Sequence, residues 1–250
     1  MNLLPSPWNT LADGSTAQAQ IEHLSLSIRH THGECWLDYH YDLPGPDDLP
    51  SVRRGAAEPH SVRFLLSDAE PALRVTPQLA DRTVVVRPTM PTELPPKQCA
   101  TLFISTVLWA RVAVGEQTLA ELPGVRLSDT WFGADTRRGE LCYASQTRAL
   151  LSLENIQYSA MRAITPITID NQGDDNVRLE RINVPVPNLT LYCDGERFWT
   201  SGVRILREKN LATANVQIEA SPRPDTFLVA SPRHLIRGGV LDRAVDLLFA

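Results

Sequence analysis

The sequence lacks every short motif that would assign a chemistry directly. It has no nucleophile elbow, phosphate-binding loop, zinc knuckle or dinucleotide fingerprint. Only 4 cysteines are present, they lie far apart in the chain, and no pair has the C-x-x-C spacing of a redox or zinc site. We therefore expect reduced thiols, a cytoplasmic location and no cofactor.

Long apolar runs are also missing. No window approaches about 18 uninterrupted apolar residues, and residues 1–14 contain no cationic segment followed by an apolar run. We therefore expect no transmembrane segment in the chain. The formal net charge of −5 at pH 7 makes nucleic acid an unfavourable partner.

The sequence is instead rich in short β-branched and aromatic segments separated by Pro, Gly, Asn and Asp. Residues 24–28 alternate between apolar and polar, and the apolar run 101–114 favours one or two central strands. Residues 162–200 predict a β-meander that ends in a hairpin across Asp194-Gly195. Strands at this spacing are typical of β-sandwiches.

The fold class that follows is all-β, with two β-sandwich-like units and a short C-terminal amphipathic helix. Hydrophobic residues make up 43% of the chain, which is enough for one or two cores. We expect a flexible lead-in over residues 1–20, an N-terminal unit over 21–127 and a C-terminal unit over 128–250.

The predicted helix follows Gly238-Gly239, where apolar residues recur at helical spacing with acidic and basic residues on the other side. Such a stripe either covers an open end or edge of the sandwich or contacts a partner, which could be a second subunit. The candidate partner contacts are Val240, Leu241, Val245, Leu248 and Phe249.

The densest group of potential metal ligands is His30, His32 and His40, with Cys35 between them. Their spacing does not select zinc, and solvated imidazoles on an exposed face explain it equally well. The other histidines that could serve a hydrolase, His60 and His234, sit in no recognisable motif, so we assign no catalytic residue.

Three large aromatics at loop or strand ends are candidates for ligand contact. They are Trp131, Phe132 and Trp199. Exposed aromatics form recognition surfaces, whereas buried ones fasten one unit to another, and the sequence leaves both interpretations open.

Four segments carry a resemblance to a known family: Asp129–Gly133, Gly139–Ala144, Arg162–Asn171 and Val184–Pro187. From about residue 128 to 230 the chain resembles the prokaryotic domain-of-unknown-function family DUF432. The resemblance implies a β-rich protein and brings no catalytic residues. Some relatives are encoded near small-conductance mechanosensitive channels, which implies a soluble partner of a membrane protein.

The function predicted from these observations is a non-catalytic binding or assembly module, with a membrane protein such as a mechanosensitive channel as one partner. The alternative is a carbohydrate- or small-molecule-binding protein, or a hydrolase, that uses a cleft between the two units. Trp131 and Trp199 would then line the cleft beside nearby carboxylates.

Overall fold

The computed structural model describes residues 4–5, 8, 10–12, 16–31, 33–42, 58–66, 73–133, 137, 139–147, 150–156, 158–208, 213–220, 223–235 and 240–244. Over this part of the chain the fold is all-β, as predicted, and its helical content is limited to two short 3-10 helices, η1 (Leu153–Asn155) and η2 (Val186–Asn188). None of the described helices has the length and apolar character needed to cross a bilayer.

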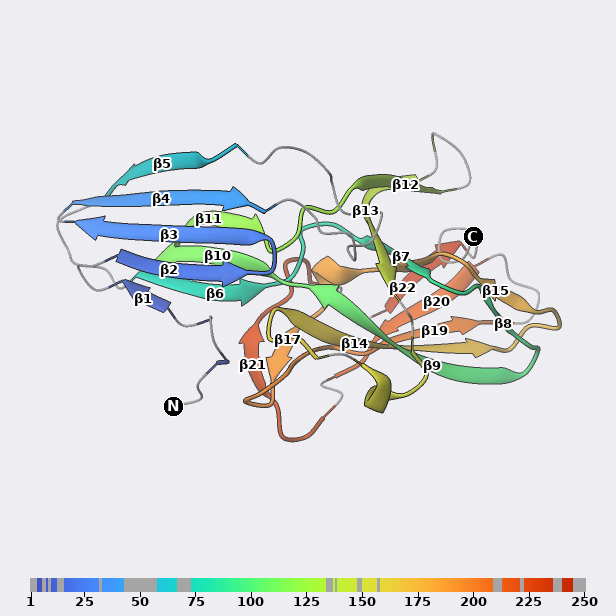
Figure 1. Cartoon of the computed structure of the whole chain (residues 1–250). Helices are drawn as coiled ribbons and strands as arrows, with labels where there is room; N and C mark the ends of the chain where they lie inside the picture. The colour runs from blue at the N-terminus through green and yellow to red at the C-terminus, as the bar shows by residue number, and fades with distance from the viewer. Residues whose placement is uncertain are drawn as a thin grey trace.

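Two four-stranded sheets form what we call the first unit, at the left of Figure 1. Alternate residues of their strands point inward, and Leu26 and Leu37 of one sheet belong to the same buried cluster as Val75 and Val112 of the other. The strands of the first sheet, in order, are β2 (Thr16–Ile21), β3 (Leu24–Thr31), β4 (Glu34–Tyr41) and β5 (His60–Leu65). Those of the second are β1 (Thr10–Ala12), β6 (Leu73–Gln78), β10 (Trp109–Val114) and β11 (Gln117–Pro123).

The remaining strands make the second unit, whose largest sheet is built around β14 (Arg162–Asn171). One edge of β14 pairs along its whole length with β9 (Gln98–Val107). The other edge pairs in parallel with β18 (Phe198–Thr200) and then β19 (Val203–Arg207). The outer strands of this sheet are β17 (Leu191–Cys193), β20 (Thr213–Ile218), β21 (Phe227–Ala230) and β22 (Val240–Ala244).

Two smaller sheets complete the second unit. One has the order β12 (Asp129–Gly133), β13 (Gly139–Thr147), β7 (Val84–Pro88) and β16 (Ile182–Val184). The other pairs β15 (Val177–Leu179) with β8 (Thr92–Leu94). Strands that are distant in sequence therefore share sheets.

A proline in the middle of β14 is accommodated by a bulge in the neighbouring strand. Phe103, which pairs with Pro166, exchanges both backbone hydrogen bonds with Leu150, so the backbone nitrogen of Pro166 points to the opposite edge. On that edge the register shifts by one residue between β18 and β19, around Ser201 and Gly202. Proline has no backbone N–H to donate. Its nitrogen faces the register shift between β18 and β19, where the ladder needs no donor.

The strand run β9–β10 belongs to both units. β9 pairs with β14 in the second unit, and after Leu108 the chain continues as β10 in the first. The buried Leu108 donates its backbone N–H to Met161 (3.3 Å) and accepts from Gly124 (3.0 Å). One continuous cluster of buried apolar residues runs through both units.

The predicted C-terminal helix is wrong over residues 240–244, which form β22 and pair antiparallel with β20. Over so short a stretch, the apolar pattern of Val240 and Leu241 fits both the helical and the strand period. The edge of β20 supplies backbone hydrogen-bond partners that a helix would leave unused. The other candidate contacts, Val245, Leu248 and Phe249, lie outside the described residues.

The flexible lead-in over residues 1–20 stays a prediction; its described residues include β1, most of β2 and the buried Trp8. Another expectation needs correction. The predicted meander of residues 162–200 is interrupted, because β15 and β16 pair with strands from residues 84–94. Its final hairpin, β17–β18 across Asp194-Gly195, is confirmed. The division at residues 127 and 128 stays a prediction, and strand pairing crosses it.

The end of β14 is fixed by a buried amide. The Asn171 Nδ2 donates to the backbone oxygens of Leu94 (3.1 Å), Pro95 (3.0 Å) and Asp175 (2.8 Å), and its Oδ1 accepts from Gly173 N–H (3.1 Å). One side chain therefore holds two loops together.

Replacing Asn171 with Ala leaves buried backbone groups without partners. We expect the free energy of unfolding to fall by about 2–3 kcal/mol. The matched control is Asn176→Ala, because Asn176 is exposed and bonds to Glu93 on the surface; we expect a change within about 0.5 kcal/mol. Urea denaturation measures both, and equal losses would contradict the structural role of Asn171.

Candidate functional site

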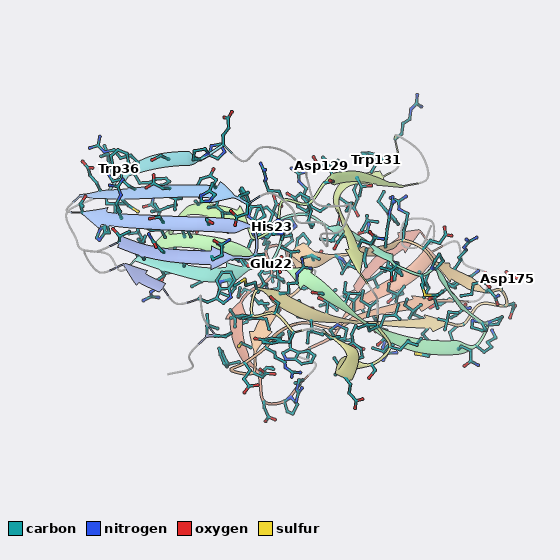
Figure 2. The ribbon with its side chains drawn as sticks, viewed as in Figure 1. Glu22, His23, Trp36, Asp129, Trp131 and Asp175 are labelled. Atoms are coloured by element: carbon teal, nitrogen blue, oxygen red, sulfur yellow. The ribbon has the colours of Figure 1, made fainter. Side chains whose placement is uncertain are left out.

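A cavity of about 240 Å³ lies where the two units meet. Its walls come from β10 and β11 of the first unit, from the connection after β11, and from β12, β13 and the segment before β7 in the second unit. We call it the junction pocket; its lining residues are Arg82, Trp109, Pro123, Val125, Arg126, Leu127, Asp129 and Tyr143. In Figure 2, the labelled Asp129 marks the β12 wall.

The aromatic wall of the junction pocket consists of Trp109 and Tyr143, whose ring centroids lie 6.0 Å apart. The guanidinium of Arg233 lies 5.7 Å from the Trp109 ring and pairs with Glu121 (Nη1 to Oε2, 2.5 Å). Tyr143 donates its hydroxyl hydrogen to Asp81 (3.0 Å). The wall is therefore held on two sides by charged groups.

Two arginines and one carboxylate give the pocket its charge. Arg82 lies 3.5 Å from Asp129 and 5.3 Å from the Tyr143 ring. Arg126 lies over the ring of Tyr41 at 4.7 Å. Among the described residues, no carboxylate lies within ion-pair distance of Arg126. Its guanidinium contacts the face of an aromatic ring, which attracts a cation.

Burial raises the pKa of Tyr143 to about 12, and the hydrogen bond to Asp81 acts in the same direction, whereas Arg82 opposes it. Burial also raises the pKa of Tyr41, with a smaller opposing effect from Arg126. Both phenols therefore stay neutral around pH 7. They present aromatic faces and hydroxyl groups to their surroundings, but no phenolate base.

The walls of the pocket are fixed in place by contacts between the units. The Glu22 carboxylate, at the turn between β2 and β3, binds Arg162 in a bidentate pair (2.5 and 3.0 Å). The backbone of Gly124 bonds to Leu108 and to His23, and a Cβ there would lie 2.9 Å from the Leu108 oxygen. Pro123-Gly124 thus ends β11 at a point where the backbones approach too closely for a side chain. Figure 2 shows Glu22 and His23 near the middle of the molecule.

Of the predicted ligand contacts, Trp131 is beside this site. Trp131 and Asp129 are both on the face of β12 that continues from the pocket, and they pair with Leu141 and Tyr143 of β13. The Trp131 side chain is 43% exposed. Phe132 points to the other face, where it is fully buried with Val85 and Cys142.

Trp199 is part of the core of the second unit. Its side chain is buried, its Nε1 donates to Asp194 Oδ2 (2.9 Å), and Arg223 lies 5.2 Å from its ring. The structure therefore does not bring Trp199 together with Trp131 in the junction pocket, which Trp199 does not line.

The predicted metal ligands are separated. His30 pairs with the buried Cys35, so it lies on the inward face of the sheet, whereas His40 pairs with Ser25 on the outward face. The two are also five residues apart along the hairpin, or about 17 Å. His32 lies outside the described residues. Within the described ranges, no three His, Cys, Asp or Glu side chains gather around a common point.

Sequence reasoning missed most of the residues that line the pocket. Asp129 and Tyr143 lie in segments that carried the family resemblance, but nothing in those segments marked them as site residues. Trp109 stood in an apolar run, and Arg126 in a connection. Only the packing of the two units brings these residues together.

The raised pKa of Tyr143 predicts a pH effect. A tyrosine in an unfolded chain has a pKa of about 10, so the unfolded state loses its proton first as the pH rises. The stability that depends on this proton is complete below pH 10 and is lost as the pH rises through about 12. In phenolate absorbance titrations, the curve of wild type minus Tyr143→Phe should have its midpoint near 12. A midpoint near 10 would show that the phenol is not buried in the pocket wall.

Comparison with known proteins gives a family and no activity. Neither the curated proteins nor the solved structures contain a significant match to the chain. Residues 7–249 match the family described as "Protein of unknown function (DUF432)". The match extends over both units, beyond the segment in which the sequence resemblance was clearest. The chain belongs to the DUF432 family.

Proposed function

We propose that this protein is a non-catalytic binding module that takes a small anionic ligand in the junction pocket. The observation that carries the proposal is Arg126, a residue of the pocket lining that forms no ion pair with a carboxylate among the described residues. Arg82, on the opposite unit, supplies a second cation. An anion between them would receive charge-assisted hydrogen bonds from planar donors.

The chemistry of the lining supports binding rather than catalysis. The one carboxylate, Asp129, pairs with Arg82, and the pKa of Tyr143 is far above neutral. The Tyr143 phenol is therefore not poised to exchange a proton at neutral pH, as a general acid or base would need to be. Both units supply walls of the pocket, so a bound ligand would stabilise their packed arrangement. We infer that each of the two units is sandwich-like.

The location that fits this proposal is the cytoplasm. All four cysteines are free, and Cys35, Cys142 and Cys193 are buried. Unpaired thiols are typical of proteins in a reducing compartment. Burial raises the pKa of Cys35 and of Cys193, which keeps these thiols protonated.

A second proposal is contact with a membrane protein or a second copy of the chain. It is supported by the position of β22, which is the last strand of its sheet and pairs on one side with β20. An edge strand can accept a strand from another chain. Removal of residues 240–250 separates the two proposals, because it would abolish such pairing and leave the junction pocket intact.

Loss of the Arg126 side chain tests the binding proposal. We expect inorganic phosphate, titrated at low ionic strength in a calorimeter, to bind Arg126→Ala at least tenfold more weakly than wild type. A charge-assisted hydrogen bond contributes about 1.5–3 kcal/mol, and about 1.4 kcal/mol corresponds to tenfold in affinity. Arg126→Lys should lose less, because it keeps the charge without the planar fork.

The matched control is Arg111→Ala. Arg111 is an arginine of β10 that does not line the pocket, and its side chain bonds to Thr118 and Glu116. We expect its phosphate affinity to equal that of wild type. Circular dichroism and thermal unfolding confirm that each variant is folded. Equal affinities for wild type and a folded Arg126→Ala variant would contradict the proposal.

A further inference from the structure

The exposed indole of Trp131 extends the junction pocket with an aromatic surface. Trp131 and the pocket residue Asp129 are two positions apart on one face of β12, a separation of about 7 Å along the strand. Leu141, which pairs with Trp131, is itself 49% exposed. An exposed apolar surface therefore borders the charged pocket.

Gly139 allows the indole to lie close against the strand. A Cβ on Gly139 would be 2.7 Å from Trp131 Nε1 and 2.8 Å from Cε2. The ring therefore lies directly against the backbone of β13, and the residue is 43% exposed. A ring supported in this way forms a rigid stacking surface, which loses little entropy when a ligand binds.

The open edge of β12 is less suited to pairing with another strand. Arg181 Nη2 donates to the backbone oxygen of Trp131 (2.8 Å), and its guanidinium lies 4.7 Å from the ring centroid of Phe132. A charged side chain that occupies the edge of a strand opposes strand addition there. We therefore expect a ligand to contact the exposed part of Trp131 rather than the β12 backbone.

The groups around Trp131 favour a flat conjugated ring over a sugar. Among the described residues near this face, Asp129 pairs with Arg82, and the Tyr143 hydroxyl donates to Asp81. A saccharide would need partners for many hydroxyl groups, because polar groups that lose water without a partner reduce affinity. An aromatic ring needs only the indole face.

We propose that the ligand of the junction pocket is a small molecule with an aromatic ring and an anionic group, of the mononucleotide class. The ring stacks on Trp131, and the phosphate reaches Arg126 and Arg82. This inference rests on the proposed function, because it assigns the anionic end to the same pocket. A cavity of about 240 Å³ is smaller than the usual range for whole ligands, which agrees with a ligand that is only partly enclosed.

Adenosine monophosphate, phenyl phosphate and inorganic phosphate, titrated separately, test the inference. We expect wild type to bind adenosine monophosphate at least tenfold more tightly than phosphate, because stacking of a base on an aromatic side chain contributes that much or more. In Trp131→Ala this advantage should disappear while the affinity for phosphate stays the same. Tryptophan fluorescence should change when adenosine monophosphate binds wild type, and this change should be lost in Trp131→Ala.

The matched control is Trp36→Ala. Trp36 lies on the first unit at the far end of the molecule from β12, and its ring is flanked by Arg29 and Arg63, each 5.6 Å away. We expect this variant to bind all three compounds as wild type does. Tight binding of phenyl phosphate with no further gain for adenosine monophosphate would overturn the mononucleotide class.

The outcomes separate the two proposals. If phosphate binds through Arg126 but Trp131→Ala binds adenosine monophosphate as wild type does, the aromatic inference fails and the proposed function stands. If a folded Arg126→Ala variant binds inorganic phosphate and adenosine monophosphate as tightly as wild type does, the anionic pocket fails. Absence of binding by all three compounds contradicts both.

Discussion

The strand run β9–β10 is the constraint on which the rest of the structure depends. Up to Val107 it pairs with β14, and from Trp109 it pairs with β6 and β11. Leu108, between these two parts, is buried and bonded on both sides through its backbone. Since one strand run supplies the central ladder of both units, neither unit can move far from the other without breaking paired backbone groups.

The junction pocket follows from this constraint. Trp109 is the first residue after Leu108, so the crossing strand itself supplies part of the aromatic wall. The Glu22–Arg162 pair and the close approach of Gly124 to Leu108 hold the remaining walls at the same point. Because its walls come from both units, the pocket depends on their packing. A ligand that bridges Arg82 and Arg126 would therefore stabilise the packed form over any form in which the units separate.

Much of the fold could be predicted from local sequence, because alternation and turn residues act over a few positions. The strand around Leu26, the apolar run that became β9 and β10, and the Asp194-Gly195 hairpin are confirmed. The same reasoning failed for Val240 and Leu241. The five residues of β22 fit a helix or a strand equally well, and pairing with the edge of β20 makes them a strand. It also failed for residues 177–184, whose partners come from segments about 80–100 residues earlier in the chain.

The candidate site was harder to predict, because no local pattern marks it. Trp131 was identified from its size and position, and the structure places it beside the pocket. Phe132, its neighbour, is buried because successive residues of a strand face opposite ways. Nothing in the sequence marks Arg82 and Arg126, because only the packing of the two units brings both into the pocket lining.

Calorimetric unfolding of the whole chain tests the central claim most directly. If the β9–β10 run and the shared core join the units, the protein unfolds in one transition whose calorimetric and van't Hoff enthalpies agree. Two resolved transitions, or a calorimetric enthalpy well above the van't Hoff value, would show that the units unfold separately. That result would contradict the claim that one strand run holds both units and the pocket between them.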